Sequence, residues 1–158
     1  MPHFIRVQHE ALDAWHEVAC AQQQLEPGKH GAQVTFIGSL RDFSDGEVVH
    51  AMELEHYPGM TERYIERICD DAEQRWPLEC IMVLHRVGKL LPGEPIVMIA
   101  VWSSHRAAAF DACRHLISQL KHDAPFWKRE LLDSGARWVT TNTPDVGEPS
   151  VEQAAGYP

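Results

Sequence analysis

The sequence predicts an α+β fold, with a mostly antiparallel sheet and about three helices. Residues 47–56 alternate between apolar and charged side chains, which is typical of an antiparallel strand with one buried face. Two apolar stretches, 80–88 and 95–102, follow each other with only a loop containing Pro92 and Gly93 between them. Because no helix separates these two strands, a doubly wound parallel sheet is disfavoured.

In the N-terminal part, residues 3–8 predict a short strand. Residues 10–24 predict a helix, because their apolar side chains recur at helical spacing. Residues 26–31 contain proline and two glycines and predict a turn. The β-rich stretch 34–37 predicts a strand, followed by a polar loop at 39–46.

Two longer helices follow. One is predicted to begin at Pro58 and to end before Pro77. The other is predicted after Ser103 or Ser104, either of which can cap it. The apolar positions that indicate these two helices are Tyr64, Ile68, Ala72 and Trp76 in the first, and Ala109, Cys113, Leu116 and Leu120 in the second.

The C-terminal part predicts a short helix or turn at 126–133 and a last strand at 136–140. We expect a single catalytic domain over residues 1–140. Residues 141–158 are polar and rich in proline and glycine, and we expect them to be loosely ordered unless a partner binds them.

Composition excludes several classes of protein. The 158 residues carry a net charge of −9, which disfavours a nucleic-acid binder because such proteins need a broad basic face. No apolar run approaches the ~20 residues that span a bilayer, and the N-terminus does not resemble a signal peptide, so we expect a cytoplasmic protein without membrane contact. Residues 103–138 nevertheless hold six basic and four acidic side chains, a local excess of cations that suits a small anion.

The four cysteines are scattered and form no CxxC pair, which favours reduced thiols in the core. The ten histidines include no HExxH motif and no pairing with cysteine at zinc spacing. We therefore expect no metal site.

Several cations are candidates for an anion site. His105 and Arg106 fall in a first helical turn, where backbone N–H groups and the helix dipole attract anions. Lys121 ends the same helix, Lys128 follows two aromatic residues, and Arg41 follows a strand. Each has an ordinary alternative as a solvated surface residue, so the residues alone indicate only a candidate site for a phosphate or carboxylate.

Several strings, taken together, resemble the large catalytic subunit of molybdopterin synthase. The HYPGMT string at 56–61 and the APFWK string at 124–128 are long and unusual. The similarity covers roughly residues 31–139 in the family's order. Its other parts are 34–38 leading to Arg41, 85–88 with 92–93, 104–106 with 109–110, and 120–121.

The resemblance implies an α+β fold of the α/β-hammerhead type and a homodimer of large subunits. Each subunit would bind a small ubiquitin-like sulfur carrier, whose C-terminal Gly-Gly thiocarboxylate enters the pocket. The carrier's sulfur would pass to cyclic pyranopterin monophosphate, and two transfers would form the dithiolene of molybdopterin. The resemblance implies no metal or organic cofactor for this step.

The resemblance also assigns residues. Lys121 and Lys128 would be catalytic, with Lys121 as the candidate for proton transfer or covalent chemistry. Some relatives carry a basic residue at position 39, where this chain has Ser39. Phe36 would lie near the pocket, and the substrate-binding residues would be Ser39, Leu40, Arg41, His105, Arg106, Lys121, Lys128, Arg129 and Glu130.

Helix geometry adds a further expectation. Arg106 and Lys121 are fifteen residues apart, which corresponds to about 22 Å along one helix. They cannot hold the same small phosphate within one chain. We therefore expect His105 and Arg106 to complete a pocket whose Arg41, Lys121 and Lys128 come from the other subunit.

Two other functions remain open on the sequence alone. The chain could be a non-catalytic binding module for a ubiquitin-like partner, with Phe126 and Trp127 as a docking patch. It could also be a metal-dependent phosphohydrolase that uses the histidines.

Overall fold

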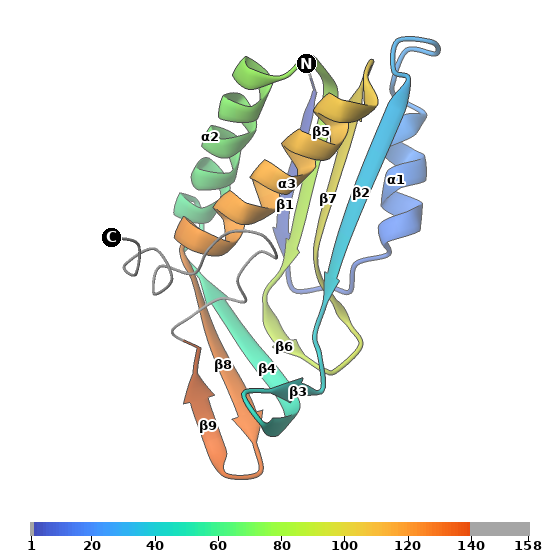
Figure 1. Ribbon diagram of the computed structural model, residues 1–158. Coiled ribbons are helices and arrows are strands. Elements are labelled where there is room, and N and C mark those ends of the chain that lie inside the picture. The colour runs from blue at the N-terminus through green and yellow to red at the C-terminus, as the bar shows by residue number, and fades with distance from the viewer. Residues whose placement is uncertain (1, 140–158) are drawn as a thin grey trace, which may run out of the picture.

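The computed structural model describes residues 2–139, which form two sheets and three helices (Figure 1). The first sheet has the order β1 (His3–Gln8), β5 (Leu78–Arg86), β7 (Pro95–Ser103) and β2 (Ala32–Ser39). Only β1 and β5 pair in parallel; the β5–β7 and β7–β2 pairs are antiparallel. The α+β fold with mostly antiparallel sheets and three helices is therefore confirmed.

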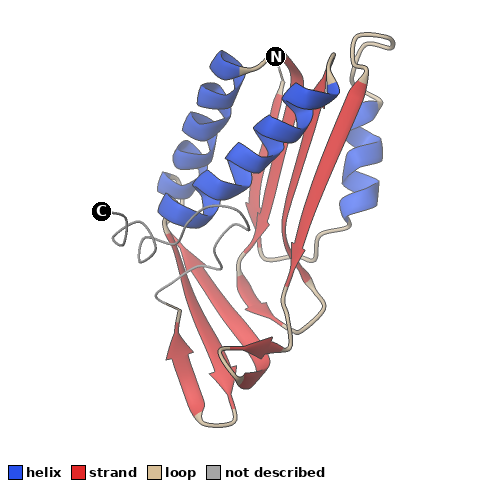
Figure 2. Cartoon of the chain, in the orientation of Figure 1, coloured by secondary structure: helices blue, strands red, loops and turns tan. Residues whose placement is uncertain are grey.

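The second sheet lies below the first in Figure 2 and contains no parallel pair among its described strands. Its order is β3 (Phe43–Ser44), β4 (Glu47–His56), β8 (Phe126–Leu132) and β9 (Gly135–Trp138). The short strand β6 (Gly88–Leu90) also pairs with β4.

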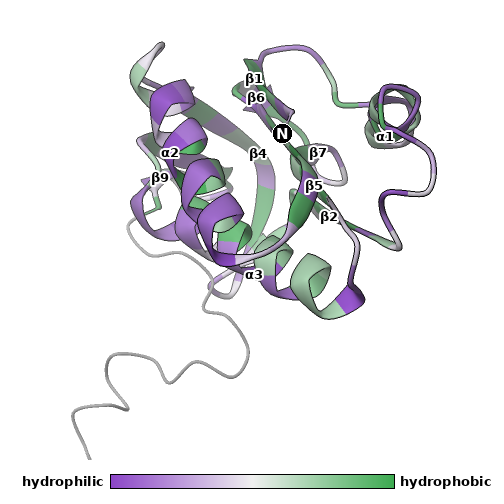
Figure 3. Ribbon diagram, turned by 90° about the horizontal axis from the view of Figure 1, so that it is seen from above, coloured by the Kyte–Doolittle hydropathy of each residue, from purple (hydrophilic) through white to green (hydrophobic). Residues whose placement is uncertain are grey.

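Helices cover both faces of the first sheet. α2 (Met60–Arg75) and α3 (Arg106–Asp123) pack on one face, and α1 (Ala14–Gln22) lies on the other, as the view from above shows (Figure 3). This arrangement explains why β5 and β7 are apolar along nearly their whole length instead of alternating, since a strand buried on both faces needs apolar residues on both. Trp102 on β7 is fully buried beneath α1.

A third apolar cluster belongs mainly to the second sheet and to the residues that follow β2 and β5. Its buried members are Leu40, Val49, Met52, Leu54, Val87, Leu90 and Leu132. The half-buried Phe126 contacts both this cluster and the one beneath α2 and α3. The start of β8 therefore lies where the two sheets meet.

The prediction of a short helix or turn at 126–133 is wrong for all but its last residue, because Phe126–Leu132 form β8 and only Asp133 lies in the turn that follows. β8 pairs with β4, so that Lys128 lies opposite Leu54 and Arg129 lies opposite Glu53. Charged residues occupy both faces of β8, so the apolar alternation that identifies a strand is hidden in this segment.

Neither predicted serine is the cap of α3. The N-cap is His105, without a side-chain cap bond, and Ser103 instead accepts a hydrogen bond from the His105 N–H at 3.2 Å and donates one to Pro77. The helix predicted at 10–24 begins only at Ala14, after the Asp13 cap. No helix of the described residues is long and apolar enough to cross a membrane. The tail predicted at 141–158 lies outside the described residues.

Candidate functional site

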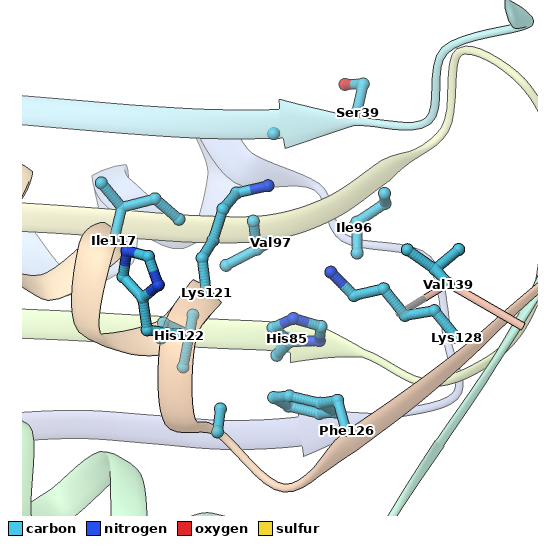
Figure 4. A pocket seen from close by; sticks show the side chains of 13 residues that line it. Ser39, His85, Ile96, Val97, Ile117, Lys121, His122, Phe126, Lys128 and Val139 are labelled. Atoms are coloured by element: carbon cyan, nitrogen blue, oxygen red, sulfur yellow. The ribbon is translucent and has the colours of Figure 1, made fainter. Parts of the chain in front are cut away.

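A cavity of about 210 Å³ lies where the C-terminal end of α3, the start of β8 and the end of β2 come together (Figure 4). Its walls combine apolar side chains with two lysines and two histidines. The lining residues are Gly38, Ser39, His85, Ile96, Val97, Ile117, Leu120, Lys121, His122, Ala124, Phe126, Lys128 and Val139.

Two lysines that are separated along the chain meet in this cavity. Lys121 is in the last turn of α3, and Lys128 is the third residue of β8. Between them, Pro125 prevents the helix from continuing, and the chain turns into the strand. Figure 4 shows both side chains extending into the same hollow. A cavity with two adjacent amines favours a ligand or transition state that carries negative charge.

Lys128 has an altered acidity. Burial lowers the pKa of Lys128 to about 8, and the nearby Lys121 lowers it in the same direction, while Glu130 opposes the change. An amine with a pKa near 8 is present in both protonation states close to neutral pH. Lys128 can therefore donate or accept a proton more readily than an exposed lysine.

The end of β2 forms the opposite wall. The pairing with β7 shifts register between Gly38 and Ser39, and the exposed Ser39 then lines the cavity. A Cβ atom on Gly38 would lie 3.0 Å from Val97 Cγ1 and 3.2 Å from the Phe36 ring. Glycine at position 38 therefore allows β2 to pass close to its neighbours at the cavity wall.

Leu40 and Arg41 follow on the same segment but do not line the cavity. Leu40 is buried, and its backbone is held on both sides, by a 3.0 Å hydrogen bond to the Glu94 carbonyl and a 2.8 Å bond from the Gly93 N–H. Arg41, directly after this anchored residue, is exposed. Its guanidinium group is therefore available at the surface next to the cavity wall.

His105 and Arg106 lie at the other end of α3 from Lys121. Both are exposed, and neither lines the cavity. Within one chain, the structure therefore does not bring them together with the lysine pair, as the length of the helix requires.

Arg129 and Glu130 differ from Lys128 in orientation or environment. Arg129 pairs with Glu53 and lies over the Trp138 ring at 5.8 Å, on the opposite face of β8 from Lys128. Glu130 is on the same face as Lys128 but is buried and bound by Arg137 at 3.2 Å and by Ser44 at 3.3 Å. Neither residue lines the cavity.

Sequence reasoning did not assign His85 or Phe126 to the site. Both line the cavity, and their rings stack with centroids 4.0 Å apart. A histidine within an apolar strand gives no signal that separates a core position from a site position. The string at 85–88 contributes to the family resemblance but assigns no role to His85.

Among the described residues, one group of side chains could share a metal ion. His3, Asp70 and Glu73 have donor atoms that lie within 4.8 Å of one another. Contacts of 3.8 Å from His3 to Asp70 and 3.5 Å from His3 to Glu73 are also those of ordinary ion pairs. None of the three residues lines the cavity.

The fold and the cavity define a class: an α+β protein whose site presents paired amines, one of them of lowered pKa, to an anionic ligand. The family model described as MoaE protein matches residues 7–123. The molybdopterin synthase catalytic subunit of Pseudomonas aeruginosa is 50% identical over 135 residues, covering 85% of this chain and 89% of that relative.

Solved structures agree. The molybdopterin biosynthesis MoaE protein from Burkholderia ambifaria superposes with a TM-score of 0.76 and 42% identity, covering 92% of this chain and 94% of that one. A structure titled as the complex of subunits 1 and 2 of molybdopterin-converting factor from Helicobacter pylori shares the fold, with a TM-score of 0.72, 20% identity and coverage of 86% and 90%. This chain belongs to the MoaE family of molybdopterin synthase catalytic subunits, which transfer sulfur in molybdenum cofactor biosynthesis.

Proposed function

We propose that the cavity containing Lys121 and Lys128 is where sulfur passes from the C-terminal thiocarboxylate of a small carrier subunit to cyclic pyranopterin monophosphate. The observation that carries this proposal is the convergence of two lysines in one partly buried hollow. Both reactants are anions, and each chemical step develops negative charge on oxygen or sulfur. Paired ammonium groups in a site with little water stabilise such charge.

The chemistry has two stages for each sulfur. The thiocarboxylate sulfur forms a bond to a side-chain carbon of the pterin while the bond from that carbon to an oxygen or phosphate breaks, leaving a thioester to the carrier. Water then adds to the acyl carbon, which releases the carrier's carboxylate and leaves the sulfur on the pterin. A second carrier supplies the second sulfur.

Two residues have distinct roles in this scheme. Lys121 moves a proton to the leaving oxygen or forms a transient covalent link to the acyl carbon. Lys128 stabilises the developing charge, and its pKa of about 8 also allows proton exchange near neutral pH. No metal or organic cofactor takes part.

The remaining residues predicted from this part of the chain either bind the substrate or support the site. Arg41, exposed next to the cavity wall, suits a clamp on the substrate phosphate. Ser39 and the anchored Leu40 fix the wall that leads to Arg41. Arg129 and Glu130 stabilise β8 through Glu53 and Arg137, and so support the position of Lys128 without reaching the cavity.

We assign His105 and Arg106 to the cavity of a second subunit. Within one chain they are at the far end of α3, and both are exposed. In a two-fold homodimer, that exposed end can cover the partner's cavity and add two groups that bind anions. The active unit would then be a homodimer with one carrier bound at each site. The name "catalytic subunit" of its relatives supports a further subunit, which the carrier would supply. A cytoplasmic location stays a prediction.

The decisive experiment mixes the purified chain with a thiocarboxylated carrier and cyclic pyranopterin monophosphate. Mass spectrometry should detect a product that has gained two sulfurs, together with a carrier that ends in a carboxylate. A carrier with an ordinary carboxylate terminus is the matched control and should give no product. An unchanged pterin after incubation with the active carrier would contradict the proposal.

A further inference from the structure

His85 is a buried histidine in the wall of the cavity. It lies on β5 with only 4% of its surface exposed, and its ring stacks on Phe126 at an interplanar angle of 19°. Figure 4 shows the ring beside the two lysine side chains, with Phe126 beneath it. The stacking on one side and the burial of the residue fix the orientation of the imidazole.

The hydrogen bond of His85 determines which ring nitrogen carries the proton. Nδ1 lies 2.7 Å from the carbonyl oxygen of Arg86. A carbonyl oxygen can only accept, so Nδ1 holds the hydrogen. In the neutral ring, Nε2 is then a lone-pair acceptor.

The surroundings keep this ring neutral. Burial lowers the pKa of His85 to about 3, and the charges of Lys128, Lys121 and His56 lower it further, against the opposing effect of the Arg86 carbonyl. Lys128 is on β8, Lys121 on α3, His56 on β4 and Arg86 on β5. His122 of α3 also lines the cavity. His85 therefore does not add a third positive charge to the two lysines at any pH near neutrality.

We propose that His85 is a positioning residue for the lysine pair: its neutral ring accepts, through Nε2, a hydrogen bond from an ammonium group in the cavity and so orients Lys128 toward the reactants. This inference deepens the proposed function and rests on it for its catalytic meaning. A purely structural role would need only the flat ring that stacks on Phe126, which a phenylalanine also supplies.

The first test needs no substrate. The full chain is labelled with ¹³C at the lysine side chains and ¹⁵N in the histidine rings, and is titrated by NMR; the Lys128 signal is assigned by its loss in Lys128→Arg. His85 should show a protonated Nδ1 and an unprotonated Nε2 from pH 5 to pH 9. A proton on Nε2, or titration of this ring near its ordinary pKa, would overturn the proposal.

Two variants separate hydrogen bonding from packing. His85→Phe keeps a flat ring but has no acceptor, so the ammonium form of Lys128 loses a stabilising partner, and the pKa of Lys128 should fall by about one unit. His85→Gln restores an acceptor and should keep the pKa of Lys128 near that of the unaltered chain. His115→Phe, at a histidine that binds Asp71 outside the cavity, is the matched control and should leave the Lys128 titration unchanged.

The outcomes are distinguishable from failure of the proposed function. Equal Lys128 titrations in the unaltered chain and in His85→Phe would overturn the positioning role, whatever the protein catalyses. In the sulfur-transfer assay, the pH profile of His85→Phe should shift toward acid in the same direction as the Lys128 pKa, with partial return in His85→Gln. A chain that transfers no sulfur at all refutes the proposed function and leaves the NMR result standing. If His85→Phe does not fold, the tautomer of His85 in the unaltered chain still tests the positioning role, because a proton on Nε2 would overturn it.

Discussion

Burial, together with the nearby Lys121, lowers the pKa of Lys128 at a cavity that forms where α3 gives way to β8. The two residues are only seven apart in the sequence, and the turn at Pro125 directs both side chains to the same hollow. Glu130, on the same face of β8, opposes the shift, but its carboxylate also binds Arg137 and Ser44. Two amines in one cavity, one of them buried, are unfavourable for folding and favourable for binding an anion.

The cost of burying Lys128 should be measurable as stability. Its pKa is about 8 in the folded chain, below the ordinary 10.5, so the unfolded chain binds more protons between these values. The free-energy cost of burying the charged Lys128 amine is therefore full below pH 8 and disappears as pH rises toward 10.5. Lys128→Met, which keeps the apolar stem, should raise the free energy of unfolding at pH 7 by on the order of 2 kcal/mol. Urea denaturation at pH 7 and at pH 10.5 measures this gain, which should vanish at the higher pH.

The matched control for this measurement is Lys29→Met. Lys29 is an exposed residue whose ion pair with Glu26 spans 3.8 Å, and such surface pairs contribute little. Its substitution should change stability by less than about 0.5 kcal/mol at either pH. A Lys128→Met variant that is less stable than the unaltered chain at pH 7 would show that Lys128 is not strained by burial.

Activity should depend on Lys121 far more than on the net charge of the protein. Removing a group that transfers a proton in the reaction costs about 10²-fold or more in rate. Lys121→Ala should therefore reduce the rate of sulfur transfer by at least that factor under single-turnover conditions. Lys29→Ala removes the same charge outside the cavity and should react at the unaltered rate. Wild-type turnover by Lys121→Ala would refute the assignment of Lys121.

Much of the first sheet could be predicted from the sequence, because its strands are apolar and its helices carry regular apolar stripes. β8 could not, since Lys128 and Arg129 place charge on both faces of the strand and conceal its period. Because β8 is a strand, neighbouring residues point to opposite faces. Lys128 therefore reaches the cavity, whereas Arg129 pairs with Glu53.

The site was less predictable than the fold. Lys121 and Lys128 could be predicted as candidates, because Lys121 lies near a helix end and Lys128 belongs to a string that is typical of the family. His85 was missed because its position in an apolar strand is equally typical of a core residue. What distinguishes it is contact with Phe126 and proximity to two lysines from other elements, and these depend on tertiary packing.

The cysteines should differ sharply in reactivity. Burial raises the pKa of Cys69 to about 12, of Cys80 to about 12 and of Cys113 to about 11, and all three are buried. Cys20 is half-buried on α1 and is not part of the core clusters. Titration of the native chain with a chromogenic disulfide at pH 8 should detect one fast thiol, and the denatured chain should give four. A second fast thiol in the native chain would contradict the packing described for α2, α3 and β5.

A side chain at Gly38 should destabilise the folded chain. An added methyl would lie 3.0 Å from Val97 Cγ1, and both Val97 and Phe36 are packed in the cluster beneath α2 and α3. Overpacking of this kind costs about 1–3 kcal/mol. Thermal unfolding should show that loss for Gly38→Ala. The exposed neighbour Ser39 provides the control, since Ser39→Ala should change stability by less than about 0.5 kcal/mol. Equal stabilities for the two variants would mean that β2 moves away without strain.

The proposed sharing of one active site between two subunits can be tested by mixing inactive variants. Arg106 lies at one end of α3 and Lys121 at the other, so a shared site takes Arg106 from one chain and Lys121 from its partner. Arg106→Ala and Lys121→Ala homodimers should each be nearly inactive. After the two variants are unfolded and refolded together, about half of the dimers contain one chain of each kind. Each of these dimers has one of its two sites intact, so about one quarter of full activity should return.

If both residues served the same chain's cavity, every site in the mixed dimer would carry one of the two substitutions, and no activity would return. Refolding each variant alone provides the baseline, and size-exclusion chromatography of the mixture checks that dimers have formed.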